Sequence, residues 1–403
     1  MPMNDQHLTY SPFDPEITED PYPVYRELRH HAPAYWSAQA NTWVLSRYDD
    51  VSAALVDPTR YSSASGIFPT PPGVDMTQLF LPMLIMTDPP RHTALRKIVS
   101  KAFTPRRIAE LKSHVHAIVE DLLSHSADSS RWDFVSEFSG PLPAIVIADM
   151  LGVPREDRDR FRSWSTTLIQ SNPTRGEFGP GLDAAAALYD YFSAFLAERR
   201  AHPQDDLMSA LVQAEADGEH LSEEELLGFC LLLLVAGHET TTNLLSNSAV
   251  VLSENPESRR LLTDRPELVP GAVEELLRYD SPVQGLSRTL IQPVDLHGQR
   301  MMAGDTVLLL FGSANRDEDA FPDADRFDIH RAPERQVAFG RGIHFCLGAA
   351  LARLEARIAL QTLLASRRDW EVDLDSAVRL RSGPIRGYIS LPIEHACAPA
   401  QAE

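Results

Sequence analysis

Cysteine is scarce in this chain of 403 residues, which contains only Cys230, Cys346 and Cys397. Three widely spaced cysteines exclude a disulfide framework and a zinc-binding spacing. No strongly basic stripe is present and the net charge is −20, which argues against a nucleic-acid partner. No apolar run reaches membrane-spanning length, and the polar, acidic N-terminus lacks the pattern of a signal peptide. We therefore expect a cytoplasmic protein that does not enter a membrane.

Linkers, low-complexity tracts and internal repeats are also missing. Length alone suggests two or three domains, but the absence of any Gly/Ser linker favours a single large domain over residues 1–403. A hydrophobic fraction of 43% is ample for one large core. We expect residues 1–20 to be a flexible N-terminus and residues 395–403 a flexible tail.

Helical patterns, separated by proline and glycine, dominate what remains. The predicted helices cover residues 21–30, 48–55, 92–102, 105–124, 143–151, 156–170, 182–202, 206–216, 223–253 and 269–277. The predicted strands are few and mostly late: 42–46, 286–289, 294–296, 306–311 and 388–391. Strands that do not alternate with helices predict a mostly α fold with small antiparallel β-sheets. The irregular stretch 61–86 is long enough to indicate a functional or disordered loop.

Cys346 stands where a glycine-containing loop, Phe339-Gly340-Arg341-Gly342-Ile343-His344-Phe345-Cys346-Leu347-Gly348, turns into a strong helix former. The free N–H groups and positive dipole of a helix N-terminus favour a thiolate, which is either a nucleophile or a metal ligand. Gly340 and Gly342 allow the backbone to approach a flat ligand closely. A dinucleotide-binding loop is excluded, because Phe345 stands where such a loop needs its third glycine. A buried cysteine that is merely a small apolar side chain remains an alternative, as does a cysteine protease.

A second feature interrupts the long apolar helix pattern of residues 223–253. Gly237, Glu239 and Thr240 lie in its middle. Glycine inside a helix costs about 1 kcal/mol relative to alanine, and threonine can bond back to a carbonyl of the preceding turn. Such a local break often marks a functional site. The alternative is that Gly237 ends one helix and a new helix follows.

Two pairs of residues are weaker signals. Glu275 and Arg278, three residues apart, can pair on one helix face, as many solvated pairs do. His92 and Arg96 are four residues apart, just after Pro90, and suit an anionic ligand group. An ordinary basic helix surface would explain the second pair equally well.

Together, these four features resemble a bacterial cytochrome P450, a haem-thiolate monooxygenase, over essentially the whole chain. The run Phe-Gly-x-Gly-x-His-x-Cys-x-Gly is highly specific, and Ala-Gly-x-Glu-Thr-Thr and Glu-x-x-Arg occur in the family's order. The resemblance implies the cytochrome P450 fold, bound haem b, and activation of O2. One oxygen atom would be inserted into a hydrophobic small molecule by hydroxylation or epoxidation, as in secondary metabolism.

The resemblance also assigns roles to residues. Cys346 matches the thiolate ligand of the haem iron, and Phe339 the aromatic ring that packs beside the sulfur. Glu239 and Thr240 match the acid–alcohol pair that supplies protons in oxygen activation. The remaining haem-binding positions are His92, Arg96, Arg288 and His344 at the propionates, Gly340, Gly342 and Gly348 in the loop, and Ala236 and Gly237 beside the oxygen site. Glu275 and Arg278 match a structural pair whose expected third partner is Arg326.

No flavin or iron–sulfur segment is recognised, so the resemblance implies a separate ferredoxin and ferredoxin reductase as partners. A basic patch for ferredoxin is expected from Arg96, Lys97, Lys101, Arg341, Arg353 and Arg357. The expected substrate pocket consists of Phe68, Leu84, Ile85, Leu168, Val235, Val283, Gln284, Leu286 and Tyr388. No lysine or arginine lies between Tyr61 and Pro90. A neutral hydrophobic substrate is therefore predicted, such as a terpenoid, steroid, macrolide or aromatic compound.

Three alternatives share the haem. A peroxygenase would use peroxide without a reductase, and a desaturase or ring-coupling enzyme would direct the same chemistry to another product. A non-catalytic haem-binding protein would need no proton relay. Glu239 and Thr240 argue against the first and the last of these.

Overall fold

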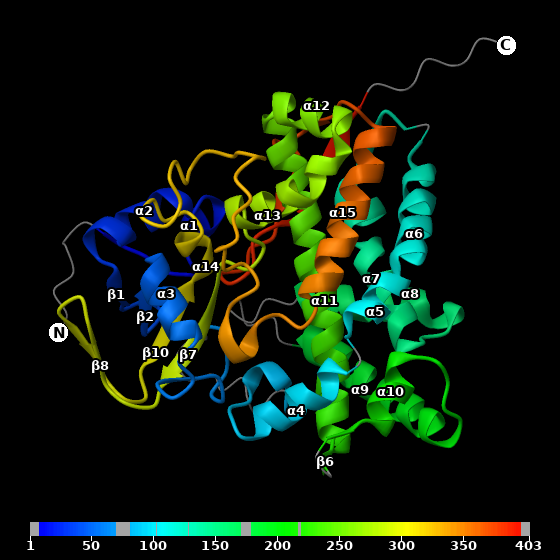
Figure 1. Cartoon of the computed structure of the whole chain (residues 1–403), viewed down its shortest axis with the longest axis horizontal. Coiled ribbons are helices and arrows are strands. Elements are labelled where there is room, and N and C mark those ends of the chain that lie inside the picture. The colour runs from blue at the N-terminus through cyan, green and yellow to red at the C-terminus, as the bar shows by residue number, and fades with distance from the viewer. Residues whose placement is uncertain are drawn as a thin grey trace.

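One long helix, α11 (Glu223–Glu254), runs through the middle of the molecule (Figure 1). The computed structural model describes residues 8–69, 81–101, 103–127, 129–170, 179–216 and 219–395. Helix α11 is buried along most of its length. Ser222 caps its N-terminus: its hydroxyl accepts from the Glu225 N–H at 3.2 Å, and the Glu225 carboxylate accepts from the Ser222 N–H at 2.8 Å. The helix passes through Gly237 without ending. The predicted break, and the alternative of a helix end at Gly237, are therefore both wrong.

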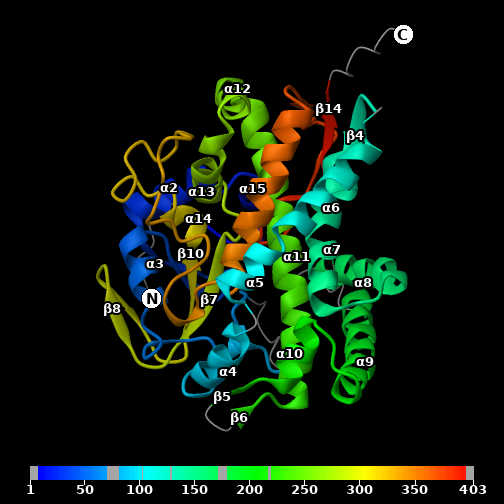
Figure 2. The ribbon, with the colours of Figure 1, turned by 45° about the vertical axis from the view of Figure 1, so that its right-hand side comes forward.

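Other helices surround α11. Those in contact with it include α7 (Pro141–Leu151), α8 (Arg158–Gln170), α9 (Gly179–Ala201), α12 (Pro256–Asp264), α13 (Val269–Tyr279) and α15 (Ala349–Ser366). Figure 2 shows α8 and α9 side by side on the flank of α11. The other helices are α1 (Pro15–Glu19), α2 (Tyr22–His31), α3 (Tyr48–Leu55), α4 (Arg91–Ser100), α5 (Pro105–Glu110), α6 (Lys112–His125), α10 (Leu207–Gln213) and α14 (Phe311–Ala314).

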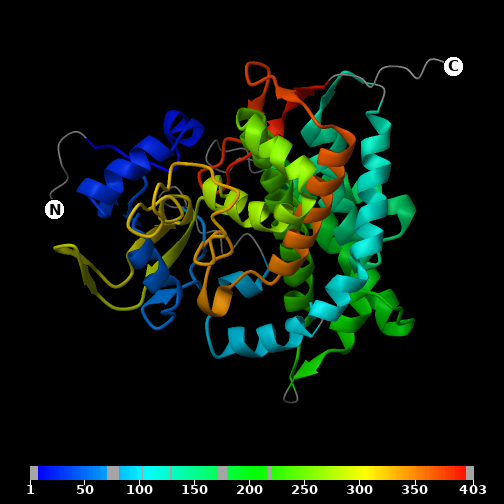
Figure 3. The ribbon, with the colours of Figure 1, turned by 45° about the horizontal axis from the view of Figure 1, so that its top comes forward.

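The main sheet lies to one side of the helical part (Figure 3). Its strands are, in spatial order, β1 (Ala34–Ser37), β2 (Thr42–Leu45), β10 (Thr306–Leu310), β7 (Gly285–Leu290) and β3 (Tyr61–Ser62). Neighbouring strands are antiparallel except β2 and β10, which are parallel. The smaller sheets are antiparallel and consist of β4 (Arg131–Asp133) with β11 (Glu371–Val372) and β14 (Pro392–Glu394), β12 (Val378–Arg379) with β13 (Tyr388–Ser390), β5 (Glu215–Ala216) with β6 (Glu219–His220), and β8 (Val294–Leu296) with β9 (Gln299–Met301). The predicted fold class, mostly α with small sheets in a single domain, is confirmed.

The element boundaries differ from the sequence predictions in a few places. The predicted helix 105–124 is two helices, α5 and α6, which meet at Leu111. The predicted irregular segment 61–86 includes strand β3 and a single 3-10 turn, Leu84–Met86, and its residues 70–80 lie outside the described residues. None of the helices in the described part of the chain has the length and apolar character needed to cross a membrane.

The terminal segments are partly packed. Residues 8–20 are not the flexible tail that we expected, because they include α1 and because Tyr10 is only 2% exposed and packs against Tyr25. At the other end, the His395 N–H donates to the Ser130 carbonyl at 3.0 Å. Residues 396–403, the rest of the predicted C-terminal tail, lie outside the described residues.

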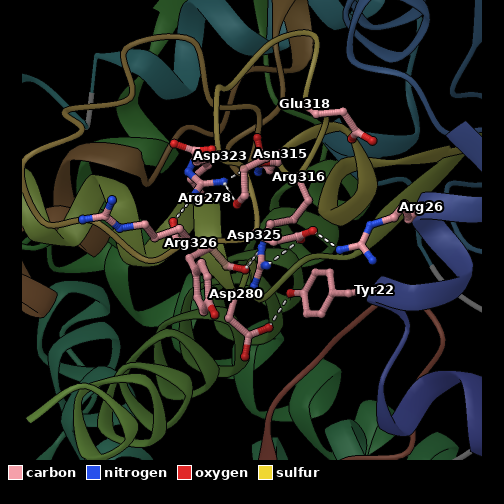
Figure 4. Close-up of polar contacts among 12 residues, drawn as sticks. Tyr22, Arg26, Arg278, Asp280, Asn315, Arg316, Glu318, Asp323, Asp325 and Arg326 are labelled. Atoms are coloured by element: carbon pink, nitrogen blue, oxygen red, sulfur yellow. Dashed lines mark hydrogen bonds and ion pairs between the residues drawn. The ribbon is translucent and has the colours of Figure 1, made fainter. Parts of the chain in front are cut away.

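A buried ion pair connects α13 to the segment that follows α14. Glu275 and Arg278 are both fully buried, and the Arg278 guanidinium donates to both carboxylate oxygens, at 2.7 and 2.8 Å. Arg278 also donates to the carbonyl of Asn315 at 2.8 Å (Figure 4). It donates to the Ala324 carbonyl at the same distance. The pair is therefore a structural element of the interior rather than a solvated surface pair.

The predicted third member of this network, Arg326, is wrong. The side chain that reaches Glu275 is that of Arg331, whose Nε lies 3.1 Å from Oε1. Arg326 is exposed and contributes its backbone carbonyl, which accepts from Arg278 at 3.3 Å and from Arg331 at 3.2 Å. The chain turns beyond residue 326, where the Asp328 N–H donates to Glu275, and this turn brings Arg331 back to the carboxylate.

Candidate functional site

The loop before α15 holds Cys346 in a fixed place. Its two glycines, Gly340 (φ +67°) and Gly342 (φ +68°), adopt the left-handed backbone conformation that other residues rarely take. A Cβ atom at Gly342 would lie 2.7 Å from the Leu55 carbonyl oxygen, so the loop also needs glycine for its close approach to α3. The Cys346 N–H donates to the Phe339 carbonyl at 3.0 Å, which closes the loop.

Opposing effects act on the Cys346 thiol. Burial raises its pKa, whereas the N–H groups of Gly348 and Ala349 and the charges of Arg96 and Arg353 favour the thiolate. Donors and positive charges therefore face the sulfur from several sides. This is the environment in which a cation bound to the sulfur would stabilise the thiolate.

An aromatic pair and an arginine support the same loop. The rings of Phe339 and Phe345 meet edge to face with centroids 6.4 Å apart. The Arg353 guanidinium lies 4.4 Å from the Phe339 ring centroid and donates to the Glu274 carboxylate at 2.6 and 2.9 Å. Arg353 therefore ties the loop to α13.

Four basic side chains from separate parts of the chain lie close to this loop. His92 and Arg96 lie on α4, and Arg288 on β7. The rings of His92 and His344 have centroids 4.3 Å apart, and Arg96 donates to the Phe345 carbonyl at 2.7 Å. Burial lowers the pKa of Arg288 to about 10, and burial, followed by the charge of Arg288, lowers the pKa of His344 to about 3. The structure thus brings together all the residues that we expected at the propionates.

This basic cluster is poorly satisfied by the described residues. His92 is 2% exposed, yet neither of its ring nitrogens has a hydrogen-bond partner. The Arg288 guanidinium, also buried, donates to the Ser287 carbonyl at 2.8 Å. Unpaired polar atoms and a buried cation are both costly, and Asp88 is the only anion among the described residues that acts on both His92 and Arg288. The cluster therefore fits an anionic group, and with the nearby thiol it fits an iron porphyrin carrying carboxylates.

Glu239 and Thr240 lie halfway along α11. Burial raises the pKa of Glu239 to about 8, so this carboxyl group is protonated at neutral pH. The Thr240 hydroxyl donates to the Ala236 carbonyl at 2.6 Å, which leaves the lone pairs of its oxygen free to accept. Ala236 is exposed, whereas most residues of α11 are buried or partly buried.

Gly237 has a different role from the one we expected. A Cβ atom at this position would lie 2.5 Å from Cδ1 of Ile147 on α7. Glycine at this position leaves room for the Ile147 side chain, whose terminal methyl group would have to shift to admit a Cβ atom. The helix is not opened at this point.

The predicted pocket residues are not all alike. Leu84, Ile85, Leu168 and Val235 belong to or pack against the large hydrophobic core that includes α11, and Val283 and Leu286 pack against the core of the main sheet. Phe68 is 40% exposed, whereas its neighbour Ile67 is buried. Gln284 is buried and donates to the Ser281 carbonyl at 2.7 Å. Tyr388 is buried, and the Arg379 guanidinium lies over its ring at 4.4 Å from the ring centroid.

Sequence reasoning missed several residues around the site. Ile385 pairs with Val283, one of the predicted pocket residues, in an isolated β-bridge. The Ser63 hydroxyl lies 3.2 Å from Nε2 of His344, and the Ser63 N–H donates to Asp88 at 2.9 Å. In the sequence, only the pair of serines at 62 and 63 pointed to a polar contact here. Ser63 and His344 are far apart in the sequence, so no local pattern shows that they meet.

Comparison with known proteins defines the class and then the family. Solved structures with the same arrangement of helices and sheets include cytochromes P450, so this chain has the fold of that class of protein. A family model described as "Cytochrome P450" matches residues 20–264 and 262–382. The chain belongs to the cytochrome P450 family, whose members bind haem b and act as monooxygenases.

Individual relatives match nearly the full chain. A Vitamin D(3) 25-hydroxylase from Pseudonocardia autotrophica is 40% identical over 387 residues, which is 94% of this chain and 95% of that protein. The structure of cytochrome P450 CYP109Q5 from Chondromyces apiculatus has a TM-score of 0.90 and 38% identity, covering 98% of this chain and 100% of that one. CYP109E1 from Bacillus megaterium, solved in complex with testosterone, has a TM-score of 0.84 and 37% identity, covering 93% and 99%.

Proposed function

We propose that this monooxygenase inserts one oxygen atom into a neutral hydrophobic molecule of the steroid or terpenoid class, by hydroxylation, with electrons from a ferredoxin and a ferredoxin reductase. The observation that carries the choice of substrate is the apolar character of the predicted pocket. Leu84, Leu168 and Val235 supply no charge, and Gln284 already donates to a backbone carbonyl. The names of two relatives, a vitamin D hydroxylase and an enzyme solved with testosterone, support the same class.

The roles of the basic cluster and the thiol follow from their contacts. Haem b supplies the redox-active iron that activates oxygen when it is bound. Cys346 would be its sulfur ligand, held by the loop and by the N–H groups that face the sulfur. His92, Arg288 and His344, with Arg96, would bind its carboxylates, which would supply partners for the unpaired ring nitrogens of His92 and a counter-charge for the buried Arg288 guanidinium.

Glu239 and Thr240 would handle the protons. A carboxyl group whose pKa is about 8 holds a proton at neutral pH and can release it to a developing base nearby. The Thr240 hydroxyl, fixed by its bond to the Ala236 carbonyl, can accept a hydrogen bond from water or from a protonated oxygen species. The pair therefore suits proton delivery on the α11 side of the site, which favours oxygen activation over a peroxide-only or non-catalytic role.

The basic patch proposed for ferredoxin is smaller than the sequence suggested. Arg353 is neutralised by Glu274, and Arg341 donates to the Ser52 hydroxyl at 2.8 Å. Arg357 lines a surface cleft of about 300 Å³ together with Pro105, Ile108 and Val273. This cleft, which adjoins the helix following Cys346, is our proposed contact with ferredoxin.

Because reduced ferredoxin is supplied in the cytoplasm, we expect the enzyme to act there.

Turnover with two matched compounds tests this function. The purified holoprotein would be assayed with a surrogate ferredoxin, its reductase and NADH, using a neutral steroid and the corresponding steroid carboxylate. We expect the neutral compound to shift the haem spin state and to be hydroxylated, and the carboxylate to do neither. Preference for the carboxylate would contradict the substrate class. Equal turnover with peroxide alone would favour the peroxygenase.

Replacement of Thr240 by alanine should uncouple the reaction. Product formed per NADH should fall at least about tenfold. The loss should stay below the hundredfold or more that a positioned proton donor contributes, because Glu239 remains. NADH consumption should continue, with hydrogen peroxide released. Thr240→Ser keeps the hydroxyl and should stay coupled. Tight coupling in Thr240→Ala would remove Thr240 from proton delivery.

A further inference from the structure

A buried hydrogen bond joins α8 to the centre of α11. The Ser165 hydroxyl lies 2.7 Å from Nδ1 of His238, and the two residues are 0% and 6% exposed. His238 directly precedes Glu239 in the helix. None of the roles considered so far uses this contact, although it lies one residue away from the proposed proton donor.

The turn that contains His238 has sequence features that lower the intrinsic stability of a helix. Gly237 lowers the intrinsic helix preference at its start. Two threonines bond back to carbonyls within it: Thr240 to Ala236 at 2.6 Å and Thr242 to His238 at 2.8 Å. Such bonds compete with the helical hydrogen bonds and tend to bend a helix. The exact direction of the side chains in this turn therefore depends on contacts from outside the helix.

Two neighbouring helices supply those contacts. Ile147 of α7 packs onto the bare backbone of Gly237, and Ser165 of α8 holds the His238 ring. The first contact is apolar and can slide, whereas a hydrogen bond to a ring nitrogen fixes an orientation. Because His238, Glu239 and Thr240 are consecutive, a change in the rotation of His238 about the helix axis would redirect the other two.

We propose that the Ser165–His238 hydrogen bond is a positioning contact that sets the direction of Glu239 and Thr240. His238 is a positioning residue rather than a catalytic one. This inference rests on the proposed function of Glu239 and Thr240. It deepens that proposal by making their alignment depend on α8.

The position of Ser165 also connects this contact to the proposed substrate pocket. Leu168 is three residues further along α8 and so lies on a similar face of the helix. A substrate that presses on Leu168 would act on the same helix that orients His238. Helix α8 therefore carries both a residue of the predicted pocket and the contact that holds His238.

Ser165→Ala tests the proposal in the full-length holoprotein through two readouts. Because the variant leaves Nδ1 of His238 buried without its partner, amide hydrogen exchange in residues 231–245 should rise at least about fivefold. Product per NADH with the neutral steroid should fall roughly two- to fivefold, an incomplete loss because Thr240 keeps its hydroxyl. The substrate dissociation constant should stay within about twofold, since Ser165 itself is buried away from solvent.

Matched variants separate positioning from packing. Ser248→Ala removes an equally buried hydroxyl from α11, one that donates to the Leu244 carbonyl at 2.6 Å, and should change neither readout. His238→Asn keeps a polar atom near the position of Nδ1 and should retain coupling, whereas His238→Leu should not. In a Thr240→Ala background, Ser165→Ala should add little further uncoupling, because both changes act on the same step.

Hydrogen exchange and coupling together distinguish a positioning role of the Ser165–His238 contact from simple packing. Local exchange and uncoupling that rise together in Ser165→Ala, but not in Ser248→Ala, would support the proposal. A lowered melting temperature with unchanged coupling, and with exchange in residues 231–245 raised no more than in α15, would overturn it in favour of simple packing. The exchange measurement needs no substrate. It therefore still decides the question if the neutral steroid is not oxidised and the proposed substrate is wrong.

Discussion

Replacing Cys346 by serine should abolish the red-shifted Soret band of the reduced, carbon monoxide-treated protein and, with it, NADH-dependent oxidation. Sulfur is the soft, polarisable ligand that the family's iron requires, whereas a serine hydroxyl stays protonated at neutral pH and binds iron poorly. The loop itself should persist. Its closing bond runs between the backbones of Cys346 and Phe339, and Gly342 keeps its contact with Leu55.

A second cysteine provides the matched control. Cys230 is fully buried in α11, where its sulfur lies 3.4 Å from that of Met208, and burial strongly raises the pKa of its thiol. Cys230→Ala should therefore lower stability through lost packing but leave the spectrum unchanged. A red-shifted band that persisted in Cys346→Ser, or disappeared in Cys230→Ala, would contradict the assignment of Cys346 as the sulfur ligand.

The sequence predicted the fold class and the cysteine loop because these depend on local patterns. Helix α3 begins and ends at the predicted residues. Gly340 and Gly342, which were singled out for the freedom of their backbone, adopt the left-handed conformation. The convergence of His92, Arg288 and His344 was predicted through the family resemblance alone. No periodicity or spacing in the chain indicates that these three residues meet.

Contacts between distant segments account for what the sequence could not show. Arg353 was expected to be a free surface cation, but Glu274, far away in the sequence, neutralises it. Gly237 was expected to open α11, but its lack of a side chain serves the approach of Ile147. In each case the residue was noticed correctly, and the partner that defines its role lies on another element.

The buried carboxylate of Glu275 yields the largest expected effect on stability. Glu275→Ala would leave the guanidinium of Arg278 in the interior without its counter-ion. Removing one member of a buried ion pair costs about 3–5 kcal/mol of the free energy of unfolding, because an uncompensated charge remains in a poorly hydrated interior. We expect a markedly lower thermal midpoint of the holoprotein and a lower yield of folded protein.

Neighbouring residues make this prediction specific. Glu274 precedes Glu275 on α13 but pairs with Arg353 at a partly exposed site, so Glu274→Ala should cost no more than about 1 kcal/mol. Arg331→Ala should destabilise the protein, but less than Glu275→Ala, because it removes bonds to that carboxylate and to the carbonyls of the turn while Glu275 keeps its pair with Arg278. Arg326→Ala should be nearly neutral, since its exposed side chain contributes nothing to the pair and its carbonyl remains. Equal thermal midpoints for the Arg326 and Arg331 variants would show that the carbonyls, rather than the third guanidinium, hold Glu275 and Arg278 in place.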